Sequence, residues 1–125
     1  MDALCKVYLE ITTECNMDCG MCLRHRWETA PATMSPATFG RVVAGVRGRP
    51  GPATVNFSGF GEPLVHPRLF DFLAEAKEAG LRAEVVTNGV LLDQGAAERL
   101  IDLGLDRLIV SLDGAGPAAD AAMHG

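Results

Sequence analysis

Residues 12–24 read TTECNMDCGMCLR, and the chain is organised around the three cysteines of this stretch. Cys15, Cys19 and Cys22 are separated by three and then by two residues, a spacing that lets three thiolates surround one small metal centre. An iron–sulfur cluster normally takes four thiolates, so three would leave one iron of a cubane without a protein ligand. An open metal position is where an outside molecule binds and reacts, as in catalytic zinc sites. The stretch therefore indicates a reactive centre rather than a structural staple.

This Cys-x3-Cys-x2-Cys run, with the apolar Met21 before its last cysteine, resembles the cluster motif of the radical S-adenosylmethionine (radical SAM) superfamily. The resemblance implies a [4Fe–4S] cluster on Cys15, Cys19 and Cys22, with the fourth iron chelating the amino and carboxylate groups of S-adenosylmethionine. It implies that one electron cleaves S-adenosylmethionine to a 5′-deoxyadenosyl radical, and that a ferredoxin or flavodoxin type of donor supplies the electron. Met21 is then expected near the adenine.

Composition excludes several other classes of protein. The 125 residues are 48% hydrophobic and 22% charged, as in an ordinary globular sequence with one core. A net charge of −5 argues against nucleic acid as a partner. No apolar run approaches the roughly 20 residues that span a bilayer, and the first residues do not read as a signal peptide. We therefore expect a cytoplasmic protein whose cysteines stay reduced, with Cys5 as a small buried hydrophobe.

Apolar periodicity predicts strands alternating with amphipathic helices. Ser35 is the expected N-cap of the first helix, with Pro36 at its first position, and Gly80 and Gly104 are expected to stop the second and third helices. Such alternation implies an α/β fold with right-handed crossovers and a parallel sheet. The predicted strands cover residues 5–11, 53–58, 81–87 and 107–111, and the predicted helices cover about 36–47, 67–79 and 93–103.

Each predicted strand leads into a cluster of polar or glycine residues. The cysteines follow the first strand, residues 59–63 (GFGEP) follow the second, and residues 87–89 and 111–114 close the third and fourth. Parallel α/β folds bind ligands at the carboxyl ends of their strands. The four clusters therefore predict one site at one edge of the sheet.

The family resemblance implies a partial barrel of six βα units and a role for each cluster. Residues 59–62 resemble the "GGE" element that receives the amino group of S-adenosylmethionine, although Phe60 interrupts the two glycines. Taken singly, Asn88-Gly89 and Asp113-Gly114 are also common turn pairs. The resemblance implies that S-adenosylmethionine contacts the segment formed by Gly59, Phe60, Gly61 and Glu62. It also implies that the ribose or carboxylate of S-adenosylmethionine contacts Asn88, Ser111 and Asp113.

The three histidines carry no assigned chemistry, and no catalytic residue is assigned. We expect His25, His66 and His124 to be solvent-exposed residues of loops or of the terminus. His66 directly precedes Pro67, where it could help to start the second helix.

Six βα units at roughly 30 residues each need on the order of 180 residues. We therefore expect residues 1–125 to be the N-terminal part of a radical SAM core, with strands five and six absent and no turnover alone. The segments CLRHRW, GFGEPLVHP and VTNGVLL also resemble SPASM-containing maturases, including those associated with tungsten-pterin cofactors, which implies a peptide or a cofactor precursor as substrate. The alternative is a non-enzymatic iron–sulfur or zinc module, completed by Cys5 or a histidine, or a catalytically incompetent fragment.

Overall fold

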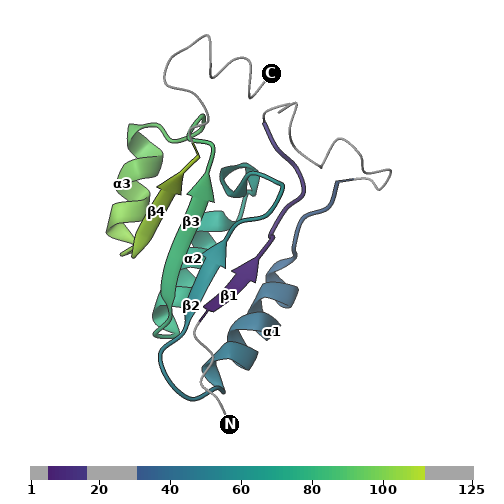
Figure 1. Cartoon of the computed structure of the whole chain (residues 1–125), viewed down its shortest axis with the longest axis vertical. Coiled ribbons are helices and arrows are strands. Elements are labelled where there is room, and N and C mark those ends of the chain that lie inside the picture. The colour runs from purple at the N-terminus through teal and green to yellow at the C-terminus, as the bar shows by residue number, and fades with distance from the viewer. Residues whose placement is uncertain (1–5, 17–30, 112–125) are drawn as a thin grey trace.

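The computed structural model describes residues 6–16 and 31–111 of the chain. In this part the chain alternates between strands and helices as the sequence predicts (Figure 1). A short 3-10 helix after the second strand is an addition that apolar periodicity did not indicate. The elements are β1 (Lys6–Leu9), α1 (Pro36–Arg47), β2 (Thr54–Phe57), η2 (Pro63–Val65), α2 (Leu69–Glu78), β3 (Arg82–Thr87), α3 (Gln94–Asp102) and β4 (Arg107–Val110).

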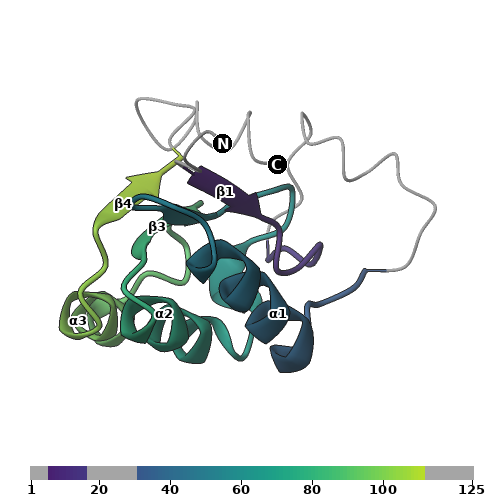
Figure 2. The ribbon, with the colours of Figure 1, turned by 90° about the horizontal axis from the view of Figure 1, so that it is seen from below.

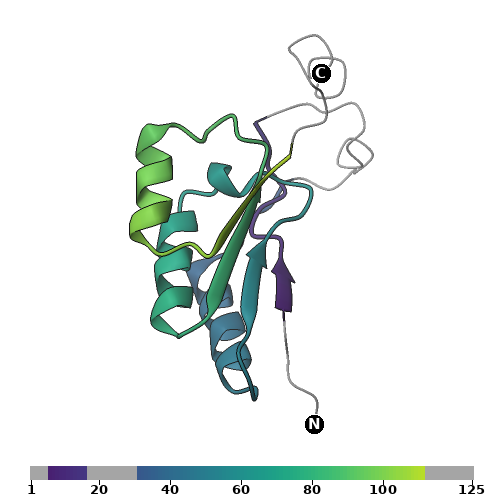
Figure 3. The same cartoon turned by 60° about the vertical axis from the view of Figure 1, so that its left-hand side comes forward.

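The four strands form one parallel sheet in the order β1-β2-β3-β4. All three helices lie on the same face of this sheet, which Figures 2 and 3 show from two directions. Because the strands are parallel, their carboxyl ends meet at one edge, toward the top of Figure 1. The α/β prediction with parallel βα units is confirmed.

Aromatic side chains fill the layer between the helices and the sheet. The ring of Phe39 on α1 stacks on Phe72 of α2 at a centroid distance of 4.3 Å and lies 5.8 Å from the ring of Phe57 on β2. All three rings are buried. Burying such a side chain stabilises the fold by about 1.5–3 kcal/mol, so this cluster joins two helices to the centre of the sheet.

The predicted helix ends are present. The Ser35 hydroxyl accepts a hydrogen bond from the Thr38 N–H at 3.2 Å, with Pro36 as the first helical residue. Gly80 and Gly104 have φ angles of 80° and 78°, the left-handed conformation in which glycine commonly follows a helix. These caps confirm the predicted start of α1 and the predicted stops after α2 and α3. The second helix begins at Leu69, two residues later than predicted, because Arg68 has a non-helical backbone conformation.

The face of the sheet away from the helices carries polar side chains. Lys6 Nζ and Asn56 Nδ2 both donate to Glu84 Oε1 at 2.9 Å, which joins β1, β2 and β3. These hydrogen bonds, that from Lys6 first, hold the pKa of the Glu84 carboxyl below its usual value although burial opposes the shift. Within the described residues, the buried Asn56 Oδ1 has no hydrogen-bond partner.

His66 differs from the expectation of an exposed loop histidine. Only 5% of its surface is exposed, and its ring lies 4.9 Å from that of Phe72. Its Nδ1 accepts from the Arg68 N–H at 2.9 Å, just before α2 begins, so Nε2 carries the proton and donates to the Met34 carbonyl oxygen at 2.9 Å. The prediction of exposure was wrong, because the loop folds back onto α2 and the segment before α1. His25 and His124 lie outside the described residues.

Candidate cofactor site at the carboxyl edge of the sheet

Cys15 lies beyond the end of β1 as a half-buried free thiol. The other predicted ligands, Cys19 and Cys22, fall outside the described residues, as do Met21, Asp113 and Cys5. The part of the chain that the structure describes contains no group of three or more His, Cys, Asp or Glu side chains placed to hold a metal. The complete ligand set therefore stays a prediction.

The two ends of the segment that carries the cysteines are held together. Thr12 and Thr33 form an isolated antiparallel bridge. Beside it the Thr13 N–H donates to the Ala32 carbonyl at 2.9 Å, and the Met34 N–H donates to the Ile11 carbonyl at 2.7 Å. These hydrogen bonds join residues 11–13 to residues 32–34, and Cys15 follows the joined residues by two positions.

The glycine-rich loop after β2 packs on the segment that leads to Cys15. The Phe60 N–H donates to Glu10 Oε2 at 2.7 Å, and the Glu62 N–H donates to the Glu14 carbonyl at 2.7 Å. Gly59 has a φ of 113°, which side-chain-bearing residues rarely adopt, and a β-carbon there would overlap the Glu10 carboxylate. The loop that resembles the "GGE" element thus contacts the segment that enters the cysteine motif.

Glu62 connects this loop to the end of β3. Its side chain is buried, and Oε1 accepts from the Thr87 hydroxyl at 2.6 Å and from the Leu64 N–H at 3.1 Å. Oε2 accepts from the Asn88 N–H at 2.8 Å. Three donors from the protein therefore compensate the burial of this carboxylate. The role of Thr87 could not be predicted from the sequence, because a threonine at the end of a strand is also an ordinary β-former.

Asn88 brings the end of β3 to the cysteine segment. Its side-chain nitrogen lies 3.8 Å from Cys15 Sγ and donates to Asn16 Oδ1 at 2.9 Å. Ser111 follows β4, and its N–H donates to the Thr87 carbonyl at 2.8 Å. The structure therefore brings Cys15, the 59–62 loop and Asn88 into contact, with Ser111 bonded to the end of the neighbouring strand.

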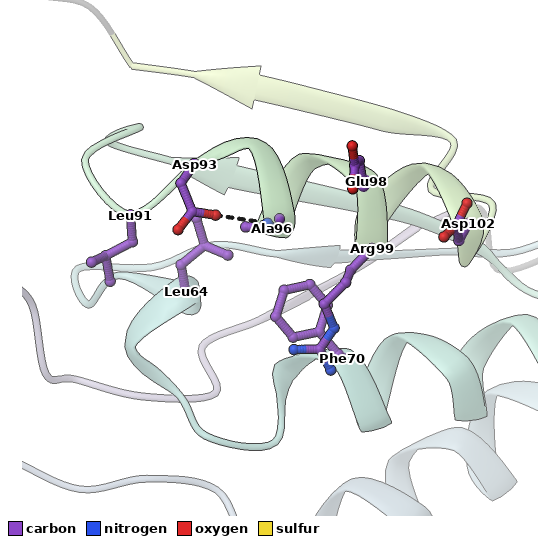
Figure 4. A pocket seen from close by; sticks show the side chains of 9 residues that line it. Leu64, Phe70, Leu91, Asp93, Ala96, Glu98, Arg99 and Asp102 are labelled. Carbon is purple, nitrogen blue, oxygen red and sulfur yellow. Dashed lines mark hydrogen bonds between the residues drawn. The ribbon is translucent and has the colours of Figure 1, made fainter.

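A groove between α2 and α3 lies on the outer side of the fold (Figure 4). The Arg99 guanidinium stacks 3.8 Å above the Phe70 ring, and the Asp93 carboxylate caps α3 by accepting from the Ala96 N–H at 2.8 Å. These side chains therefore have structural partners. The groove is lined by η2, α2, α3 and the residues just before α3 rather than by the cysteine segment, so it is not the predicted site.

Comparisons with known proteins identify the family of the chain. The sequence matches the Radical SAM superfamily over residues 9–125, which is nearly its whole length. The chain belongs to the radical SAM superfamily. This confirms the family that the cysteine spacing indicated.

Among curated relatives of this radical SAM chain is a tungsten-containing aldehyde ferredoxin oxidoreductase cofactor-modifying protein of Pyrococcus furiosus. It is 36% identical over 107 residues, a match that covers 86% of this chain and 30% of the relative. The AdoMet-dependent heme synthase of Methanosarcina barkeri is 37% identical over 110 residues, covering 85% and 30%. The second relative is named as an enzyme, and the chain spans about a third of the length of each.

Two solved structures share the fold. BtrN in complex with AdoMet and 2-DOIA superposes with a TM-score of 0.81 and 26% identity, over 94% of this chain and 49% of BtrN. Streptococcus suis SuiB bound to the precursor peptide SuiA has a TM-score of 0.76 and 15% identity, over 98% of this chain and 27% of SuiB. The second likeness concerns the fold alone. No helix in the described ranges is both long and apolar enough to cross a bilayer.

Proposed function

We propose that this chain binds a [4Fe–4S] cluster through Cys15, Cys19 and Cys22, binds S-adenosylmethionine beside it, and orients both toward a substrate. The chemistry that the bound pair supplies in this family is one-electron reductive cleavage of S-adenosylmethionine to a 5′-deoxyadenosyl radical. The protein contributes binding, orientation and exclusion of water. In this proposal residues 1–125 belong to a radical SAM core of which they are the N-terminal portion.

The observation that carries the proposal is the meeting of three loops at the carboxyl edge of the sheet. Asn88, after β3, reaches Cys15, and the 59–62 loop, after β2, is bonded to Glu10 and Glu14 of the segment that leads to Cys15. A free thiol with an amide N–H facing its sulfur suits a cluster ligand, because clusters are held by thiolates and tuned by hydrogen bonds to sulfur. The Cys15 thiol and the Asn88 amide beside it therefore suit a [4Fe–4S] cluster.

The contacts to S-adenosylmethionine form a second part of the proposal. We place its amino group at Gly59, Phe60, Gly61 and Glu62, and its adenine, ribose and carboxylate near Met21, Asn88, Ser111 and Asp113. Three protein donors already occupy the Glu62 carboxylate. We therefore expect backbone carbonyls of the 59–62 loop to provide most of the contact with the amino group.

The substrate in this proposal is a peptide or a cofactor precursor. Support comes from a relative that modifies a cofactor and from the fold shared with SuiB, which was solved with a precursor peptide. A low-potential donor of the ferredoxin or flavodoxin type would deliver the electron in the cytoplasm. No residue is assigned to the donor or to the substrate.

Electron paramagnetic resonance of the chain, reconstituted anaerobically with iron and sulfide and then reduced, tests the proposal. We expect the spectrum of a reduced [4Fe–4S] cluster, and we expect it to change when S-adenosylmethionine is added. A cluster whose spectrum is indifferent to S-adenosylmethionine, or a chain that binds only zinc, contradicts the proposal and favours a non-enzymatic metal-binding module. Methionine added at the same concentration is the control for unspecific changes.

A further inference from the structure

The side-chain amide of Asn88 has a fixed orientation. Its Oδ1 accepts a hydrogen bond from the Val90 N–H at 3.0 Å, so the carbonyl end of the amide faces the backbone that follows. The nitrogen end must then face the cysteine segment, where it lies 2.9 Å from Asn16 Oδ1 and 3.8 Å from Cys15 Sγ. An amide nitrogen has two N–H groups, and each has a partner here. The fold therefore orients the Asn88 side chain to donate a hydrogen bond to the Cys15 sulfur.

A second set of hydrogen bonds holds the Asn88 backbone in place. The Asn88 N–H donates to Glu62 Oε2 at 2.8 Å, and the Thr87 hydroxyl donates to Glu62 Oε1 at 2.6 Å. The Gly89 N–H in turn donates to Thr87 Oγ1 at 3.1 Å. Because Glu62 and Thr87 are both buried, this arrangement is shielded from water. The loop after β2 thus fixes the turn that aims Asn88 at Cys15.

We infer that Asn88 is a positioning residue whose N–H···S hydrogen bond to Cys15 raises the reduction potential of the cluster. The Glu62 carboxylate holds the Asn88 backbone in the position that this bond requires. This inference rests on the proposed function. Reduction adds negative charge that spreads onto the cysteine sulfurs, and a donor facing one of these sulfurs stabilises the reduced form more than the oxidised form. The outer partners that orient a metal ligand also affect metal retention.

This role differs measurably from a contact between Asn88 and S-adenosylmethionine. A residue that only contacts S-adenosylmethionine changes the cluster when that molecule is bound and leaves it unchanged otherwise. A residue that donates to Cys15 changes the potential of the cluster in the absence of S-adenosylmethionine. The midpoint potential without S-adenosylmethionine therefore separates the two roles, and no activity needs to be measured.

The experiment compares Asn88→Ala and Asn88→Asp with the unchanged chain, each reconstituted anaerobically and titrated by electron paramagnetic resonance without S-adenosylmethionine. Asn88→Ala removes the donor without adding charge. Asn88→Asp removes the donor but keeps the acceptor for the Val90 N–H, so the turn is preserved. Asn16→Ala and Asn16→Asp are the matched controls, because they change the other partner of the Asn88 amide nitrogen and leave the Asn88 side chain itself in place. Iron per chain and the unfolding transition are recorded for every variant.

We expect Asn88→Ala to shift the midpoint to a more negative potential and Asn16→Ala to leave it unchanged. We expect Asn88→Asp to shift it further than Asn16→Asp, which adds a charge nearby without removing the donor. An unchanged potential in both Asn88 variants overturns the inference while leaving the proposed function intact. If the chain without substitutions binds no cluster, both the inference and the proposed function are overturned.

Iron loss is also informative. If Asn88→Ala takes up less iron than the unchanged chain, the test rests on Asn88→Asp and Asn16→Asp, which add the same charge, and equal midpoint potentials in these two variants overturn the inference. Where both Asn88 variants take up less iron, the midpoint is read from the cluster that remains, and a shift to a more negative potential supports the inference.

Discussion

Gly61 packs directly against the backbone of Thr12. A β-carbon at position 61 would overlap the Thr12 carbonyl oxygen and would lie 2.8 Å from the Glu14 carbonyl oxygen. Both contacts are with backbone atoms, which cannot rotate away as a side chain does. The loop after β2 can therefore rest on the segment leading to Cys15 only if residue 61 has no side chain.

Replacing Gly61 by alanine should separate these two segments. We expect Gly61→Ala to lower the free energy of unfolding by about 1–3 kcal/mol, the usual cost of overpacking, in urea denaturation. Gly45→Ala is the matched control, because a β-carbon at position 45 of α1 meets nothing within 4 Å. That control should raise stability by about 0.5–1 kcal/mol through helix propensity. Equal stability of Gly61→Ala and the unchanged chain would contradict the packing.

Acid should weaken the contact between Glu84 and Lys6. The pKa of the Glu84 carboxyl lies below its ordinary value of 4.5 in the folded chain, so the unfolded chain binds its proton first as the pH falls. The stability from this group is present above about pH 4.5 and is lost as the pH falls through the lowered pKa. Glu84→Gln should therefore unfold with a shallower pH dependence below pH 4.5, measured by urea midpoints between pH 7 and about pH 3.

The exposed Glu78, near the end of α2, provides the control for this acid effect. Glu78→Gln should retain the pH dependence of the unchanged chain. Identical acid profiles for Glu84→Gln and the unchanged chain would show that the contact with Lys6 does not contribute to stability.

The alternation of strands and helices could be predicted because local patterns determine it. The stripe of apolar residues on α2 must face a core, and the caps at Ser35 and Gly80 depend on residues next to the helix ends. The convergence of loops at one edge followed from the parallel sheet, since all its strands end on the same side. These features depend on short stretches of sequence, so one sequence is enough to indicate them.

Contacts between distant loops could not be predicted in the same way. Glu62 and Thr87 are 25 residues apart, and His66 and Met34 are 32 apart. Whether a carboxylate or an imidazole in a loop faces water or another loop depends on how both loops fold back, which periodicity does not encode. Asn88 was expected at the site, but its orientation toward Cys15 follows only from its contact with the Val90 N–H.

His66 should contribute to stability through both ring nitrogens. His66→Phe keeps a ring beside Phe72 but leaves the Met34 carbonyl and the Arg68 N–H without their partner. We expect a loss of about 1–3 kcal/mol in the free energy of unfolding, the cost of leaving a buried polar group unsatisfied. Urea denaturation at neutral pH measures it.

Two conservative variants of His66 divide this loss between the ring nitrogens. Asparagine can place an acceptor where Nδ1 accepts from the Arg68 N–H, and glutamine can place a donor where Nε2 reaches the Met34 carbonyl. Each variant should lose less stability than His66→Phe. A phenylalanine variant as stable as the unchanged chain would show that packing alone holds this loop.

The four cysteines should differ in their effect on iron binding. Replacing Cys15, Cys19 or Cys22 by alanine should abolish the cluster, because a cubane held by two thiolates lacks the ligands that keep it in the protein. Cys5→Ala is the matched control, since the sequence places Cys5 at the start of the first strand and not in the motif. Iron and sulfide per chain after anaerobic reconstitution, with the visible absorption of the cluster, measure the effect. Loss of iron in Cys5→Ala, or its retention in Cys15→Ala, would overturn the assignment of the three clustered cysteines as the ligands.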